Sequence, residues 1–178
     1  MNLTYLNLSH NQITKIEGLD KLVNLTELYL SHNQITKIEG LDKLVNVTDL
    51  CLDTNKITKI EGLDNLDKVT YLNLSSNEIT KIEGLDNLDK VTYLDLSFNE
   101  ITKIENIMHM RRLESLSHLG NPILYTPPNI QRFLNRMRNT ENLYENSQSV
   151  HNYDIQQSLI ESVNNLLSNP NGCENIFV

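Results

Sequence analysis

The chain has 178 residues, of which 39% are hydrophobic, 21% charged and 6% aromatic. This length suits one domain of ordinary size, and the apolar share is too high for a disordered chain and too dispersed for a membrane span. The 15 basic residues against 23 acidic ones give a net charge of -8, which disfavours nucleic acid as a ligand. The N-terminus lacks a basic region followed by an apolar run, so we expect an intracellular, cytoplasmic protein.

A unit of 22 residues repeats along most of the chain and dominates its organisation. Five full copies and a sixth, degraded copy begin at Leu3, Leu25, Val47, Val69, Val91 and Leu113. The degraded copy has His118 where the other copies have Leu. Because the same pattern recurs at a fixed step, we expect the same local structure in each copy.

Within one unit, the spacing of the apolar residues changes once. Leu6 and Leu8 alternate with polar neighbours, which is typical of a strand. The later apolar residues recur every third position, which fits a tight helical or loop path; they are Ile13, Ile16, Leu19 and Leu22. One unit buries too little apolar surface to offset the entropy cost of ordering its backbone. The units must therefore stack into an array.

The pattern LxxLxLxxNxIxxIxxLxxLxx resembles the 22-residue class of leucine-rich repeat proteins over residues 3–124. That class includes a regulatory subunit of protein phosphatase 1. The resemblance implies an α/β leucine-rich repeat solenoid across residues 1–124. Such a solenoid has a parallel concave β-sheet, a tight helical or loop convex side and a C-terminal helical cap. It also makes a phosphatase one candidate partner.

Two polar columns fall at the bends of the unit. An Asn ends each strand segment, and its buried amide must bond turn backbone groups of adjacent units; this column is Asn11, Asn33, Asn55, Asn77, Asn99 and Asn121. Gly and Asn tolerate a left-handed backbone, which predicts a turn at the second column: Gly18, Gly40, Gly62, Gly84 and Asn106. We interpret both columns as structural.

The residues that alternate with the core leucines predict an exposed concave face. Its four columns begin at Tyr5, Asn7, Ser9 and His10 and vary between repeats, whereas the convex Thr-Lys-Ile-Glu sequence recurs in all five full repeats. Tyrosines with nearby carboxylates are typical of protein-binding surfaces; the alternative is a solvated face without a partner. The predicted contacts are Tyr5, Glu27, Tyr29, Asp49, Tyr71, Tyr93, Asp95 and Phe98.

Few residues point to catalysis or metal binding. His10 and His32 fall one repeat apart, but two ligands are too few for a metal. Cys51 has no evident base or second thiol nearby, and Cys173 falls in a tail that we expect to be disordered, so neither is predicted to be a nucleophile. We therefore predict a non-enzymatic protein with no cofactor, no metal and no catalytic residue.

The C-terminal third departs from the repeat. Two prolines precede Ile130, Phe133, Leu134 and Met137, a spacing that predicts an amphipathic cap helix over residues 125–138. Residues 139–153 read as a polar linker, 154–167 as a second amphipathic helix and 168–178 as a disordered tail. The segment 148–167 resembles tails of leucine-rich repeat proteins of giant DNA viruses, which implies the cytoplasm of a host cell.

The first repeat begins at Leu3 with no cap before it. An uncovered strand edge invites pairing with another chain. Two explanations remain open: the sequence is a fragment, or the edge is an interface. The second gives the alternative function, a structural or self-associating array that uses this edge and the C-terminal helix.

Overall fold

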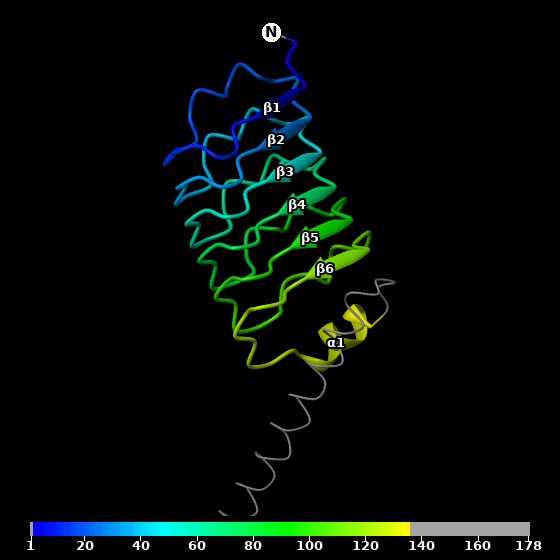
Figure 1. Cartoon of the computed structure of the whole chain (residues 1–178). Helices are drawn as coiled ribbons and strands as arrows, with labels where there is room; N and C mark the ends of the chain where they lie inside the picture. The colour runs from blue at the N-terminus through cyan, green and yellow to red at the C-terminus, as the bar shows by residue number, and fades with distance from the viewer. Residues whose placement is uncertain (1, 136–178) are drawn as a thin grey trace, which may run out of the picture.

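The computed structural model describes residues 2–135, which form a solenoid built on one parallel sheet (Figure 1). Its six short strands are β1 (Tyr5–Asn7), β2 (Glu27–Tyr29), β3 (Asp49–Cys51), β4 (Tyr71–Asn73), β5 (Tyr93–Asp95) and β6 (Ser115–Ser117). They lie side by side in chain order. Leu6 pairs with Leu28, and the later strands keep the same offset of one repeat. The predicted solenoid with a parallel sheet is confirmed.

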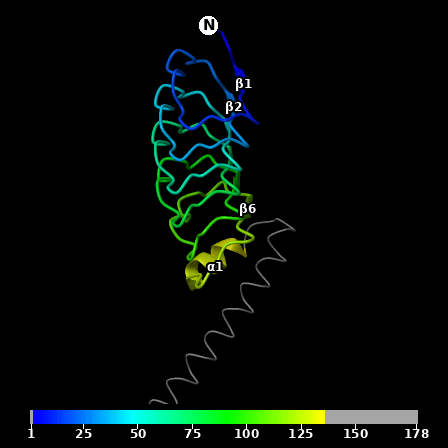
Figure 2. The same ribbon diagram turned by 60° about the vertical axis from the view of Figure 1, so that its left-hand side comes forward.

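The side opposite the sheet is made of turns and loops. Figure 2 shows the strands along one side of the stack and the returning loops along the other. A tight turn recurs there, as where Leu22 N donates to Leu19 O and Leu44 N to Leu41 O, both at 2.9 Å. In the part of the chain that the structure describes, helix is confined to α1 (Pro128–Leu134). Of the two convex paths that the sequence left open, the structure has the loop.

Stacking provides the core. In the second repeat, the inward aliphatic side chains are at most 1% exposed; they are Leu25, Leu28, Leu30, Ile35, Ile38, Leu41 and Leu44. Several of their counterparts in the first repeat, including Leu6, Leu8 and Ile13, are only partly buried, because none of the repeats within residues 2–135 packs on their outer side. The contrast between these identical positions supports the expectation that one unit depends on its neighbours for burial.

The asparagine column joins adjacent repeats through hydrogen bonds. Asn77 Nδ2 donates to Leu74 O of its own repeat at 3.1 Å and to Leu52 O of the preceding repeat at 3.0 Å. Its Oδ1 accepts from Ile57 N at 3.0 Å. The same pattern recurs at Asn33, Asn55 and Asn99. The predicted structural role of this column is confirmed.

The glycine column is left-handed, as predicted. Gly18, Gly40, Gly62 and Gly84 have φ between 67° and 75°, and Asn106 replaces them with φ 57°. A Cβ on Gly84 would lie 2.2 Å from Ile60 O of the preceding repeat. Asn106 Nδ2 donates to the corresponding Ile82 O at 2.7 Å. The whole column therefore has an unusual φ, and from the second repeat to the fourth its glycines also allow a close approach of two backbones.

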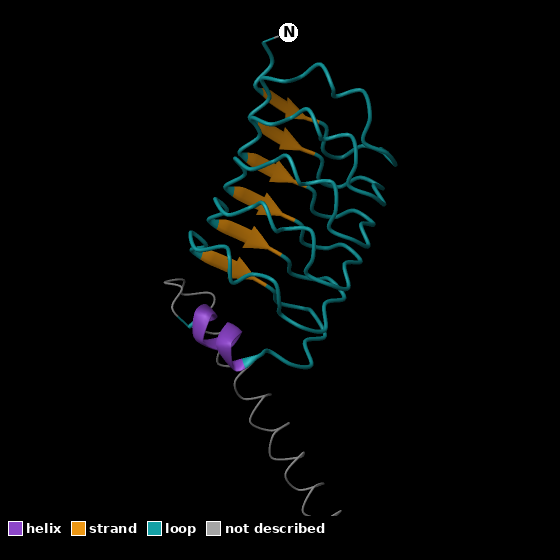
Figure 3. Ribbon diagram, turned by 180° about the vertical axis from the view of Figure 1, so that it is seen from behind, coloured by secondary structure: helices purple, strands orange, loops and turns teal. Residues whose placement is uncertain are grey.

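The helix α1 lies at the end of the stack beyond β6 (Figure 3). Pro128 occupies its first turn, and Ile130 and Leu134 are 4% and 2% exposed. It occupies the middle of the predicted segment 125–138, whereas Tyr125 forms a parallel bridge with Lys103. Met137 and the predicted segments 139–153, 154–167 and 168–178 lie outside the described residues. No helix within residues 2–135 is long and apolar enough to cross a membrane.

Candidate functional site

The outer surface of the sheet carries the residues that the sequence singles out. We call this surface the sheet face; it comprises the four columns that begin at Tyr5, Asn7, Ser9 and His10. The strand register places one residue of each repeat beside its counterpart in the next. The column of Tyr5, for example, continues through Glu27, Asp49, Tyr71, Tyr93 and Ser115.

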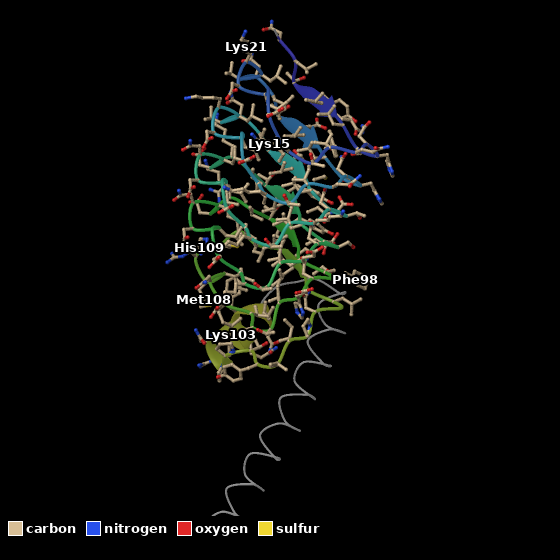
Figure 4. The ribbon with its side chains drawn as sticks, turned by 90° about the vertical axis from the view of Figure 1, so that its left-hand side faces the viewer. Lys15, Lys21, Phe98, Lys103, Met108 and His109 are labelled. Carbon is tan, nitrogen blue, oxygen red and sulfur yellow. The ribbon has the colours of Figure 1, made fainter. Side chains whose placement is uncertain are left out.

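All eight predicted contacts lie on the sheet face. Seven of them belong to β1–β5, and Phe98 follows β5. Tyr5 and Phe98 are 50% and 58% exposed, and the others are partly buried. In Figure 4, Phe98 lies on the opposite side of the molecule from Met108 and His109. Whether these eight residues contact a partner stays a prediction.

Aromatic rings pair across neighbouring strands of the sheet face. The rings of Tyr71 and Tyr93 stack with their centroids 4.6 Å apart and an angle of 1° between their planes. Tyr5 and Tyr29 make a tilted pair at 5.4 Å and 44°. Such pairs add about 0.5–1.5 kcal/mol beyond the area they bury. They therefore hold the rings in place while leaving part of each ring open to solvent.

Four carboxylates lie among these rings: Glu27, Asp49, Asp53 and Asp95. Each of them accepts a hydrogen bond: the Tyr29 hydroxyl donates to Glu27 at 3.2 Å, Thr48 Oγ1 to Asp49 at 2.6 Å, Ser31 Oγ to Asp53 at 2.5 Å and Ser97 N to Asp95 at 2.8 Å. The four columns contain no Lys or Arg. None of the ion pairs formed within residues 2–135 involves these four groups.

The opposite surface balances its charges. Lys15 pairs with Glu39 at 3.8 Å, Lys37 with Glu61 at 3.6 Å and Lys59 with Glu83 at 3.3 Å, each lysine with the glutamate of the next repeat. These pairs are exposed, so each contributes only about 0–1 kcal/mol to stability. They nevertheless pair these loop-side charges with charges of opposite sign, whereas the carboxylates of the sheet face have no Lys or Arg in their columns.

The carboxylates of the sheet face also contribute to the raised pKa values of the groups between them. Burial, followed by the hydrogen bond and charge of Glu27, raises the pKa of Tyr29 to about 12. Burial, followed by the charges of Asp53 and Asp49, raises the pKa of the Cys51 thiol to about 12. The thiol is therefore protonated at neutral pH, and a protonated thiol is a poor nucleophile.

The two histidines of the sheet face stack as the column order suggests, with ring centroids 4.3 Å apart. Across residues 2–135, no group of three or more His, Cys, Asp or Glu side chains is placed to hold a metal ion. The histidines are better explained as part of the turn that follows each strand.

Sequence reasoning missed two features of this surface. Asp53 belongs to the acidic centre but stands in a column of serines, and a comparison of charge along that column would have found it. The residues of the fourth column have a left-handed backbone with φ of 54–58°; they are His10, His32, Thr54, Ser76 and Phe98. These residue types have no common property from which the left-handed conformation could be predicted.

A family model described as leucine-rich repeats (2 copies) matches residues 2–43, 23–65 and 67–108. The chain belongs to the leucine-rich repeat family. Solved structures show the same fold, and two of them are internalins or related domains of Listeria monocytogenes. No curated protein matches the chain.

One similar structure is the functional domain of InlJ, which includes a cysteine ladder; it is 29% identical over 69% of this chain and 26% of its own length, with a TM-score of 0.60. The other is the internalin InlF of strain 4b F2365, which is 31% identical over 65% of this chain and 34% of its own, with a TM-score of 0.59. This leucine-rich repeat chain thus spans about a third or less of either structure. Cys51 is alone in its column, so the described repeats contain no cysteine ladder.

Proposed function

We propose that this leucine-rich repeat protein is a non-enzymatic protein–protein interaction module that binds its partner on the sheet face. One observation carries the proposal: the sheet face presents paired tyrosines and fixed carboxylates that differ from repeat to repeat. The loop side, in contrast, repeats the same Lys and Glu in balanced pairs.

The anchoring of these side chains supports binding rather than a merely solvated surface. The residues of β2–β5 alternate with leucines that are fully buried, so their Cα positions are held by the core. Tyr loses little conformational entropy on binding because it has two side-chain torsions. A face whose rings and carboxylates are already held in position therefore needs little reorganisation to bind a partner.

The experiment is a selection of displayed random peptides on the immobilised full chain. The selected peptides are then tested on a Tyr71→Lys, Tyr93→Lys variant. The matched control is Thr36→Lys, Thr58→Lys, which adds the same charge at exposed positions outside the sheet face. Binding by the control and loss of binding by the tyrosine variant is expected, with unchanged melting curves for both. Equal binding by both variants contradicts the proposal.

Self-association is the second candidate function, and the first repeat favours it. β1 lies at the edge of the sheet, and several apolar side chains of its repeat are only partly buried, including Leu6, Leu8 and Ile13. Sedimentation over a wide range of concentration tests it: a mass that rises with concentration and returns to the monomer value in Leu6→Lys supports an interface there. A constant monomer mass contradicts it.

Three finer predictions rest on the sequence alone. They are a phosphatase as the partner, an origin among giant DNA viruses, and the cytoplasm of a host cell as the location. The phosphatase can be tested directly by titrating protein phosphatase 1 against the full chain and the tyrosine variant. Binding that the variant loses supports it, and the absence of binding at micromolar concentration contradicts it.

A further inference from the structure

We propose that the partner docks on the sheet face through a basic, arginine-containing extended segment that crosses β2 to β5. This inference rests on the proposed function, since it names the chemistry of the segment that the sheet face binds. It follows from the charge of the face, from the stacked rings beside that charge and from the spacing of the strands.

The first argument is charge complementarity. Glu27 and Asp49 lie on the neighbouring strands β2 and β3, Asp53 follows β3, and Asp95 lies on β5, beyond β4. No Lys or Arg stands in the four columns. Within residues 2–135, every ion pair lies elsewhere. An uncompensated patch of one sign attracts a partner of the other sign and speeds its association. A phosphate backbone or an acidic peptide would be repelled from this face.

The carboxylates act together on the groups between them. The pKa of Tyr71 is raised first by burial, then by the neighbouring Cys51, and further by the negative charges of Asp95 and Asp53. Cys51 experiences Asp53 and Asp49, and Tyr29 experiences Glu27 and then Asp49 among its causes. The carboxylates of the sheet face thus act on side chains of β2, β3 and β4 that lie between them.

The second argument concerns the kind of cation. Tyr71 and Tyr93 stack, and the hydroxyl of Tyr93 donates to Asp95 Oδ2 at 3.4 Å, so a ring and a carboxylate adjoin. A guanidinium group stacks on an aromatic face while its N–H groups bind a carboxylate in the plane. The compact ammonium of Lys serves as a point charge and does not make both contacts equally well. The site therefore favours Arg over Lys.

The third argument is size. The three spacings from β2 to β5 cover about 14 Å, because parallel strands lie about 4.8 Å apart. An extended peptide covers this distance with about four residues at about 3.3 Å each. A short extended segment with two or three basic side chains thus reaches both ends of the acidic patch.

The test uses fluorescence anisotropy with labelled short peptides of alternating arginine and serine as the probe. The matched probes replace arginine by lysine or by glutamate. The sheet-face variant of the full chain converts the four carboxylates to amides: Glu27→Gln, Asp49→Asn, Asp53→Asn and Asp95→Asn. The amides keep the hydrogen-bond acceptors for Tyr29, Thr48, Ser31 and Ser97 N. Folding is checked by the melting curve of each variant.

The control variant removes the same number of charges from the loop side: Glu17→Gln, Glu39→Gln, Glu61→Gln and Glu83→Gln. The arginine peptide is expected to bind the sheet-face variant about ten- to thirtyfold more weakly than wild type, given the usual strength of exposed ion pairs. The control should stay within about threefold of wild type, since long-range attraction is screened by salt. The glutamate peptide should not bind.

A ring variant, Tyr71→Leu and Tyr93→Leu, separates arginine recognition from charge alone. Wild type should bind the arginine peptide several-fold more tightly than the lysine peptide, and the ring variant should lose this preference. Equal weakening of binding in the two amide variants would overturn the proposal, because it would show attraction to net charge only. Equal affinity of wild type for arginine and lysine peptides would overturn the choice of arginine.

The peptide selection distinguishes the failure of this inference from the failure of the proposed function. Selected peptides that require Tyr71 and Tyr93 but carry no basic residues would leave the interaction module standing and refute the basic segment. Selected peptides indifferent to the sheet face would refute both. Enrichment of arginine in peptides that depend on the sheet face supports both.

Discussion

The asparagine column provides a quantitative test of how the repeats hold together. In Asn77→Ala, Leu52 O and Leu74 O keep a partner, because Asn55 Nδ2 and Asn99 Nδ2 also donate to them. The N–H of Ile57 has no such replacement, since it donates to Asn77 Oδ1 at 3.0 Å in a buried setting. An orphaned buried N–H costs about 1–3 kcal/mol, and the lost bonds to the carbonyls add about 1 kcal/mol. We expect the free energy of unfolding to fall by about 2–4 kcal/mol.

Asn11 is the matched control, because it occupies the same column in the first repeat. Its Nδ2 donates to Leu8 O and Ser9 O, both within its own repeat, and the side chain is exposed. Asn11→Ala should therefore cost less than about 1 kcal/mol. Urea unfolding followed by circular dichroism measures both values. Equal destabilisation by the two substitutions would refute the reasoning that the bonds between repeats, and not the local turn, make this column important.

Two further predictions use the same chain as its own control. Gly84→Ala should destabilise the fold by more than about 2 kcal/mol, because the new Cβ would meet Ile60 O at 2.2 Å. Gly18→Ala has open space around it and should cost only about 1 kcal/mol, for its left-handed φ. Equal urea midpoints of the two variants would contradict this. Burial lowers the pKa of His118 below its ordinary 6.5, so the unfolded chain binds the proton first. As the pH decreases below about 6.5, the free energy of unfolding should decrease by at most about 1.4 kcal/mol per pH unit, and His118→Leu should remove that part of the loss. Identical pH profiles of the urea midpoints of wild type and His118→Leu would refute this.

The repeat makes the fold unusually predictable from the sequence. A fixed step of 22 residues sets the strand register directly, since Leu6 must lie beside Leu28 once the repeats stack. The asparagine and glycine columns were assigned correctly because each has a single physical reason, a buried amide or a left-handed φ. The path of the loop side was not decided by the sequence, because apolar residues at every third position fit a tight helix and a series of turns equally well.

The candidate surface was predictable in its membership but not in its pairing. Alternation along the strands places Tyr71 and Tyr93 on the outer side, but their stacking depends on side-chain torsions that the pattern does not determine. The ring of Tyr29 on β2 pairs with that of Tyr5 on β1, which belongs to a different column, so comparing residues within one column does not predict this pair. Cys51 belongs to an outward column yet is only 7% exposed. These features depend on side-chain size and packing, which periodicity cannot report.

Within each repeat, one set of residues stabilises the fold and another forms the sheet face, which explains how one scaffold can carry a specific surface. The aliphatic core and the asparagine bonds hold each repeat through residues that face away from the sheet face. Amide substitution of Asp49 or Asp95 therefore leaves these contacts intact and changes only the charge presented to solvent. Binding and stability should consequently respond to different substitutions: sheet-face variants alter affinity at constant unfolding midpoint, whereas Asn77→Ala lowers the midpoint wherever the partner binds. A sheet-face variant that lost binding and stability together would show that the surface and the scaffold are not independent.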